Sequence, residues 1–109
     1  MFVTSNNVVM ASNNWYLCLS NNVSSLTLPT SNVSTGDIIK ITVNSTTLNA
    51  ESSIVLNGTV YGEGISGWGQ IGSSQDPYEI DIPETLTLIY QAAGNGVTAR
   101  WNLVESNRL

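Results

Sequence analysis

Short apolar stretches that alternate with hydroxyl and amide side chains recur along this chain of 109 residues. In residues 38–43 the side chains of Ile39, Ile41 and Val43 fall on one face, and the side chains between them fall on the other. A period of two residues is typical of a strand with one buried face. Such stretches, bounded by turn residues, predict strands at residues 2–3, 8–10, 15–19, 24–29, 38–43, 53–56, 78–83, 85–90 and 100–104.

The segments between these stretches predict an all-β fold. Asn, Ser, Gly and Pro separate the strands, as at Asn57-Gly58, and no segment has the apolar period or composition of a helix. Strands with turns roughly every 8–12 residues are typical of a small β-sandwich or a barrel-like antiparallel sheet. We expect a single β domain at residues 15–104, a flexible or strand-bearing N-terminal arm at 1–14 and a C-terminal tail at 105–109. An intertwined trimer that shares strands between subunits is the alternative to strands that close within one chain.

Residues 62–75 are rich in glycine and predict a long loop. Gly62 to Gly67 match the pattern G-x-G-x-x-G of dinucleotide sites. A true phosphate site needs this turn to open a helix, and Trp68 with the glycines that follow does not favour one. Long loops usually bind a ligand or form a subunit contact, so we expect a mobile or interface loop here.

Charge and composition exclude several classes of partner. Only 10% of the residues are charged, with three basic residues against eight acidic ones and a net charge of −5. Nucleic-acid binding needs clustered cations, which this chain lacks. No apolar run reaches the roughly 20 residues of a membrane span. The first residues lack a secretion signal, so we expect synthesis in a host cytoplasm. A polar surface with few long charged side chains is typical of a protein that assembles.

The residues that carry most enzyme chemistry are scarce. The chain has no histidine, and Cys18 is its only cysteine, which we interpret as a small buried hydrophobe. Glu79 and Asp81 share one strand face, but the alternation directs Ile80 and Ile82 into the core and the two acids into water. A calcium site at Asp76, Glu79 and Asp81 is the less favoured alternative. We expect no enzyme activity, no cofactor and no metal.

The aromatic residues divide into two groups. Trp15 and Trp101 lie in predicted strands, so we interpret them as core residues or strand-end caps. Trp68 is flanked by glycines, and no alternating pattern buries it. Exposed aromatic rings stack on sugars and also anchor protein interfaces. We therefore take Trp68, Tyr61 and Tyr78 as candidate interface or glycan-contact residues, and favour the interface.

A series of short motifs resembles a known family. The chain contains, in order, Trp15-Tyr16-Leu17, Leu26-Thr27-Leu28-Pro29-Thr30, Gly36-Asp37-Ile38-Ile39-Lys40-Ile41, Leu56-Asn57-Gly58, Thr87-Leu88-Ile89-Tyr90 and Trp101-Asn102-Leu103-Val104. This order resembles a β-rich module of bacteriophage virion proteins that is frequent in phages of cyanobacteria. The resemblance covers residues 15–104, and the glycine-rich residues 62–74 depart from the shorter turns of that module.

The resemblance implies a structural role on the outer surface of a virus particle. Modules of this kind occur in tail fibres, receptor-binding tips and head-decorating proteins, are often trimeric and have no catalytic residues. A single module without repeats suits a capsid decoration or cement protein that stabilises the phage head. Its expected partners are the major capsid protein or other virion proteins and further copies of the chain in a homotrimer. The alternative is a tail-fibre or receptor-binding module that contacts host-surface glycans.

Overall fold

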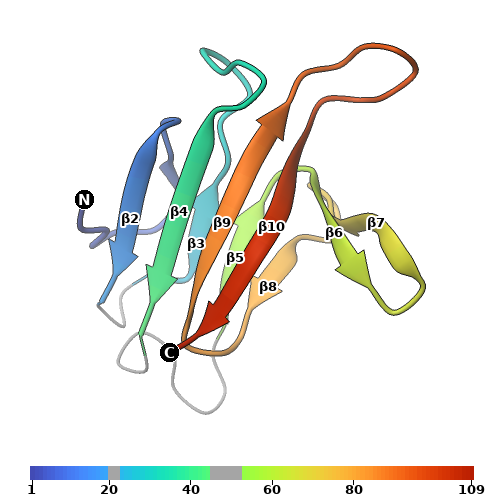
Figure 1. Cartoon of the computed structure of the whole chain (residues 1–109). Helices are drawn as coiled ribbons and strands as arrows, with labels where there is room; N and C mark the ends of the chain where they lie inside the picture. The colour runs from blue at the N-terminus through green and yellow to red at the C-terminus, as the bar shows by residue number, and fades with distance from the viewer. Residues whose placement is uncertain (20–22, 45–52) are drawn as a thin grey trace.

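The computed structural model describes residues 1–19, 23–44 and 53–109, which form two packed β-sheets and no helix. The strands are β1 (Val8–Val9), β2 (Asn14–Cys18), β3 (Ser25–Thr27), β4 (Ile38–Val43), β5 (Ile54–Asn57), β6 (Val60–Gly64), β7 (Gly67–Gly72), β8 (Tyr78–Ile80), β9 (Glu84–Gln91) and β10 (Arg100–Arg108). The smaller sheet has the order β1-β3-β5-β8 and the larger one β2-β4-β9-β10-β6-β7 (Figure 1). The all-β sandwich expected from the sequence is confirmed.

The core lies between the two sheets and follows the predicted alternation. Ile39, Ile41 and Val43 of β4 are fully buried, as are Leu86 and Leu88 of β9 on the neighbouring strand. Leu26, Leu56 and Ile80 cover them from the smaller sheet. Among the residues that the structure describes, the buried apolar ones are Val3, Met10, Tyr16, Cys18, Val23, Leu26, Leu28, Ile39, Ile41, Val43, Ile54, Leu56, Val60, Ile80, Leu86, Leu88, Tyr90 and Trp101.

Both sheets are mixed, which corrects the expectation of antiparallel pairing. β1, β3 and β5 run parallel, and so do β2 with β4 and β10 with β6. Over its first half the chain passes from one sheet to the other after every strand. Each time the chain comes back to a sheet, the new strand starts at the same end as the previous strand of that sheet. The two strands are therefore parallel. The hairpins β6–β7 and β9–β10 are antiparallel.

The glycine-rich residues 62–75 are not a long loop, because most of them belong to the β6–β7 hairpin. The chain reverses at Ile65 and Ser66, and Gly67 follows with a φ of +104°. A residue in this left-handed region after a two-residue turn is usually glycine, since other side chains are strained there. The remaining glycines leave the hairpin few side chains, and it projects from one side of the molecule (Figure 1).

Residues near both termini belong to the folded domain, and the N-terminal arm bears strand β1, as one of its two expected forms had it. Residues 1–14 pack on the domain: Val3 and Met10 are buried, and Phe2 forms a bridge with Leu17 of β2. The expected C-terminal tail is also wrong for residues 105–108, because β10 continues to Arg108 along β9. No helix among the described residues has the length and apolar character needed to cross a membrane.

Asparagine accounts for several sharp turns between the strands. Asn7, Asn13, Asn32 and Asn95 have φ between +52° and +63°. Asparagine tolerates this region better than other residues with a side chain. At Asn13 the side-chain Oδ1 also accepts a hydrogen bond from the Ile38 backbone N–H at 3.1 Å. The abundance of asparagine therefore has a structural cause in at least these turns.

Candidate functional site

Two of the three candidate aromatic residues lie on the β6–β7 hairpin. Tyr61 pairs with Gln70 and Glu63 pairs with Trp68, which places these four side chains on one face of the hairpin. The Trp68 side chain is 54% exposed. The expectation that no alternating pattern buries Trp68 is therefore confirmed, although the ring stands on a strand and not on a loop.

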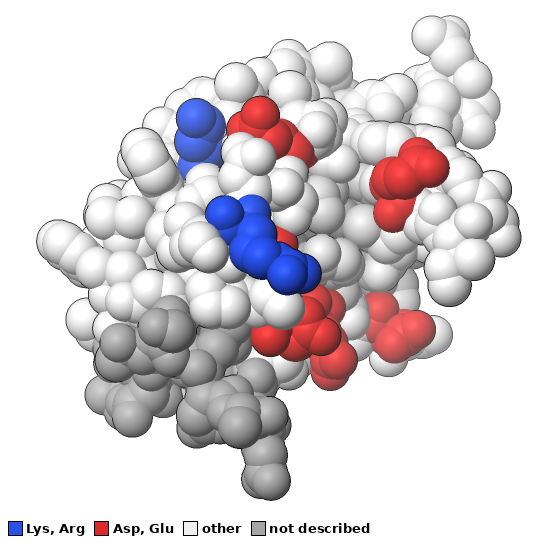
Figure 2. Space-filling model, turned by 60° about the horizontal axis from the view of Figure 1, so that its bottom comes forward, with Lys and Arg blue, Asp and Glu red and all other residues white. Residues whose placement is uncertain are grey.

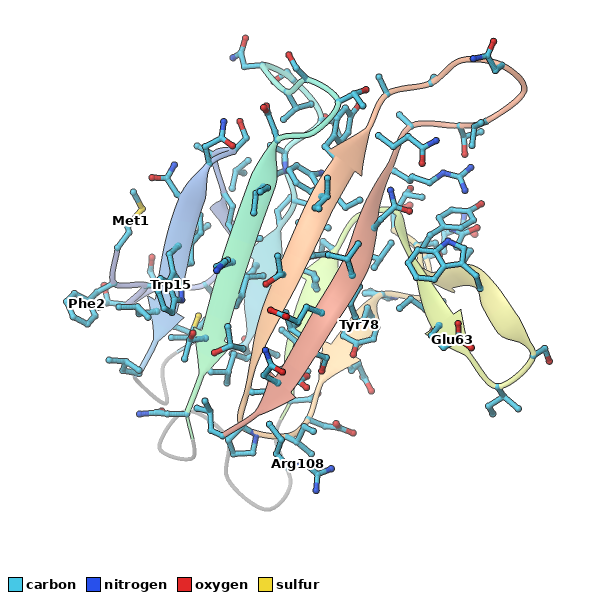
Figure 3. All side chains as sticks on the ribbon, viewed as in Figure 1. Met1, Phe2, Trp15, Glu63, Tyr78 and Arg108 are labelled. Carbon is cyan, nitrogen blue, oxygen red and sulfur yellow. The ribbon has the colours of Figure 1, made fainter. Side chains whose placement is uncertain are left out.

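The structure brings Trp68 and Tyr78 to one hollow between the hairpin and β10. The hollow has a volume of about 420 Å³. Its lining residues are Glu63, Trp68, Ile71, Tyr78, Leu103, Val104, Glu105 and Ser106. In Figure 3 Glu63 extends from the hairpin and Tyr78 lies beside β10. We call this surface the Trp68 hollow.

Tyr61 does not line the Trp68 hollow. The Arg100 guanidinium carbon lies 3.5 Å from the centroid of the Tyr61 ring, within range for a cation–π contact. β6 and β10 are parallel neighbours with Tyr61 beside Asn102, so Arg100 comes from the adjacent strand. The Arg100 contact covers one face of the Tyr61 ring, which makes this residue a poorer platform for a ligand than Trp68.

The polar groups of the Trp68 hollow include two carboxylates, which accept hydrogen bonds, and the hydroxyls of Tyr78 and Ser106. Glu63 and Glu105 are exposed carboxylates, and the Thr87 hydroxyl donates to Glu105 Oε1 at 3.4 Å. Burial raises the pKa of the Tyr78 phenol, and the negative charges of Glu84 and Asp81 raise it further. Tyr78 therefore stays protonated at neutral pH and remains a hydrogen-bond donor. An aromatic face beside carboxylates suits a polyhydroxylated ligand or a cationic protein side chain.

The prediction that Trp15 is a core residue or a strand-end cap is wrong. Its side chain is 51% exposed on the outer face of the larger sheet, while Tyr16 and Cys18 occupy the inner face. The Trp15 indole N–H donates to Thr42 Oγ1 at 2.8 Å, and the Lys40 ammonium lies 5.5 Å from the ring centroid. Trp101, in contrast, is buried as predicted, and its indole N–H donates to the Pro29 carbonyl at 3.0 Å.

A second hollow, of about 380 Å³, surrounds the exposed Trp15 ring. It is lined by Asn13, Asn14, Trp15, Ile38 and Lys40, and we call it the Trp15 hollow. No local pattern in the sequence indicates this surface, although the outward positions of Ile38 and Lys40 follow from the alternation in β4. What was missing is the parallel pairing of β2 with β4, which sets Trp15 beside Lys40.

The acidic residues of the described chain lie apart from one another. Glu79 and Asp81 are exposed and Ile80 between them is fully buried, as the alternation predicted, but Ile82, which was expected in the core as well, is only partly buried. Glu84 behaves differently, since it is buried and its Oε2 accepts a hydrogen bond from the Ser106 hydroxyl at 2.6 Å. Among the residues described, no three or more of Asp, Glu and Cys gather where they could hold a metal ion. Asp76, Glu79 and Asp81 therefore do not form the alternative calcium site.

Cys18 is confirmed as a small buried residue. It is fully buried in the core, and burial raises the pKa of its thiol to about 11. A thiol that stays protonated at neutral pH is a poor nucleophile and a poor metal ligand. Its role is packing between the sheets.

Comparisons of the chain with models of known protein families, with curated proteins and with solved structures gave no match.

Proposed function

We propose that this chain is a non-enzymatic virion structural protein that decorates the head of a bacteriophage and stabilises its shell. The observation that carries the proposal is the set of large apolar side chains on the surface at the β2 side of the sandwich. The set consists of Met1, Phe2, Trp15, Leu19 and Ile38, each at least 39% exposed. Figure 3 shows Met1, Phe2 and Trp15 close together beside β2.

Such a surface favours contact with another protein. Single exposed apolar residues are normal, but contiguous apolar patches on small proteins usually mark an interaction site. Aromatic residues in particular are enriched where protein interfaces are strongest. The virion assignment rests on the sequence resemblance to phage modules, and the low charge of the chain supports an assembling role.

The test uses phage shells that lack this chain. The purified chain is passed over a size-exclusion column with light scattering, alone and after incubation with the shells. We expect it to co-elute with the shells and to raise the temperature at which they open. A Ser74→Ala variant, changed at an exposed serine away from the β2 side, serves as the matched control and is expected to bind equally. Failure of the chain to bind any shell lacking it would refute the decoration role.

A second candidate function is contact with host-surface glycans as part of a tail fibre or receptor-binding module. The Trp68 hollow favours it, because an exposed indole lies beside the Glu63 and Glu105 carboxylates. Aromatic faces stack on sugar rings, while carboxylates accept hydrogen bonds from sugar hydroxyls. Binding on a glycan array that disappears in Trp68→Ala, together with slower phage adsorption, would support this function. An array without signal and unchanged adsorption of the Trp68→Ala phage would exclude it.

A further inference from the structure

The larger sheet exposes an aromatic side chain near each of its two ends. β2 lies at one end of the strand order and β7 at the other, and Figure 1 shows them on opposite sides of the molecule. Trp15 stands on β2 and Trp68 on β7, and both are about half exposed, at 51% and 54%. Two different apolar surfaces at opposite ends of one sheet have the arrangement needed for head-to-tail contact between copies.

We infer that copies of this chain bind one another head to tail, with the β6–β7 hairpin of one copy seated in the Trp15 hollow of the next. The inference rests on the proposed assembling role and assigns Trp15 and Ile38 to the contact between copies, which leaves Met1, Phe2 and Leu19 of the exposed apolar set for the shell. A head-to-tail contact uses two different patches, so it generates a closed ring when the rotation between copies permits. A homotrimer would be the three-membered ring of this contact.

The hairpin has the shape and composition of an inserting element. Ile65 at its turn is completely exposed, at 108% of the reference area, and Trp68 and Glu63 follow on the adjoining strands. Gly67 and Gly69 would have nothing within 4 Å of an added Cβ. The hairpin therefore offers a narrow backbone that ends in one aliphatic and one aromatic side chain, with a carboxylate beside them.

The Trp15 hollow offers the complementary groups. The Trp15 ring and the Ile38 side chain, 39% exposed, provide apolar area, and the Lys40 ammonium stands over the ring. Asn13 and Asn14 form the margin, where hydrogen bonds within the chain hold their amides in place.

Charge selects the pairing of unlike ends. Glu63 lies on the hairpin and Lys40 in the Trp15 hollow, so hairpin-to-hollow contact brings opposite charges together. Contact between two hairpins would bring two Glu63 carboxylates together, and contact between two hollows would do the same for Lys40. On the face shown in Figure 2, basic and acidic side chains both lie in the left and middle parts, whereas the right side carries only acidic ones. Such complementarity mainly decides which partners and orientations are accepted.

Backbone pairing at the β2 end is blocked, which favours recognition by side chains there. The Val3 N–H donates to the Leu17 carbonyl at 2.9 Å, and the Leu17 N–H donates to the Met1 carbonyl at 2.8 Å. Residues 1–3 thus cover the edge of β2 that another strand would need. A partner can still approach Trp15, Ile38 and Lys40, because these side chains stand on the outer face of the sheet.

Disulfide trapping between two variants tests the orientation of the contact. Ile65→Cys and Ile38→Cys each introduce one exposed thiol, and the buried Cys18 does not compete. At micromolar concentration under mild oxidation, we expect a cross-linked dimer when the two variants are mixed and little when either is alone. Equal cross-linking of the single variants with themselves, or no cross-link in the mixture, would overturn the inference.

Charge reversal provides an independent readout in solution. Glu63→Lys and Lys40→Glu are each expected to weaken self-association about two- to five-fold, the range for exposed ion pairs. Mixing these two variants places opposite charges at the hairpin-to-hollow contact again and should restore association. Glu79→Lys, at an exposed acid on β8 outside both surfaces, is the matched control and should leave association unchanged. Weakening by the control equal to that of Glu63→Lys would show a general charge effect and overturn the assigned contact.

The two tests separate this inference from the proposed decoration role. A chain that gives the mixed cross-link but ignores phage shells would refute the decoration role and leave the head-to-tail contact standing. A chain that binds shells while remaining monomeric in solution and on the shell, without the mixed cross-link, would refute the contact alone.

Discussion

The base of the β6–β7 hairpin lies against β8 so closely that only glycine fits. A Cβ atom added at Gly72 would lie 2.8 Å from the Tyr78 backbone nitrogen and 2.9 Å from the Tyr78 Cβ. Ordinary van der Waals contacts of a Cβ begin near 3.4 Å. Because the neighbouring atoms belong mainly to the backbone, Gly72→Ala must push β7 and β8 apart by about half an ångström. The close approach of Gly72 to Tyr78 fixes the position of the hairpin relative to Tyr78. Side chains of the hairpin and Tyr78 together line the Trp68 hollow.

The expected cost follows from this overlap. Forcing an extra methyl group into a packed site destabilises a protein by about 1–3 kcal/mol. Gly69→Ala is the matched control, since it lies on the same strand and an added Cβ would have nothing within 4 Å. That control should be neutral or slightly stabilising, because alanine restricts the unfolded chain more than glycine does. For a domain of this size each kcal/mol lowers Tm by roughly 4 °C, so Gly72→Ala should unfold about 4–12 °C lower.

Thermal unfolding followed by circular dichroism measures this difference directly. A urea titration of both variants checks that the midpoint falls while its slope, which reports exposed surface, stays constant. Equal Tm values for Gly72→Ala and Gly69→Ala would contradict the close packing of the hairpin on β8. The position of the hairpin relative to Tyr78 in the Trp68 hollow would then not depend on this contact.

Three further predictions concern single side chains. Trp101→Phe removes an indole N–H that donates to a buried carbonyl, so it should lower the free energy of unfolding, measured by urea titration, by about 1–3 kcal/mol. Trp15→Phe, at an exposed residue, should lower it by at most about 0.5 kcal/mol. The buried Cys18 thiol, with a pKa raised to about 11, should not react with a thiol reagent at pH 8 until the chain unfolds. Between about pH 9 and 11 only the unfolded chain loses this proton, so the free energy of unfolding should fall as the pH rises in that range. A hydrogen bond from the Ser34 backbone N–H lowers the pKa of Asp37. The midpoint of the Asp37 titration, followed by NMR, should therefore lie below the ordinary value of about 3.9. The contribution of the Asp37 carboxylate to the free energy of unfolding should be lost as the pH falls through that midpoint.

Local patterns were sufficient to predict most strands and the buried face of the clearest ones. The alternation at residues 38–43 identified β4 with its bounds, and the three residues that it directs inward are fully buried. In β9 the inward residues Leu86 and Leu88 are also fully buried, although Thr87 between them is buried as well. Period-two alternation works here because successive side chains of a strand point to opposite faces, so one polar face and one apolar face are visible in the sequence.

Local patterns failed where the residues on both faces are of the same kind. Residues 15–19 are Trp-Tyr-Leu-Cys-Leu, so no alternation shows that Trp15 points outward and Tyr16 inward. In the hairpin the opposite problem holds, because glycine at every second or third position leaves no apolar face to recognise. The sequence of β6 and β7 therefore predicts a loop, and Trp68 is a candidate only because glycines flank it and no alternating pattern buries it.

Only the tertiary structure decided which strands are neighbours, and with that which side chains form surfaces. The sequence determined an all-β chain, its core residues on β4 and the exposure of Trp68. Parallel pairing of β2 with β4 sets Trp15 beside Lys40, and pairing of β10 with β6 sets Arg100 over Tyr61. These contacts join residues far apart in the chain, and their formation depends on how the two sheets bury their apolar faces together. Period and turn chemistry report the conformation of each segment, whereas neighbours are selected by packing across the whole core.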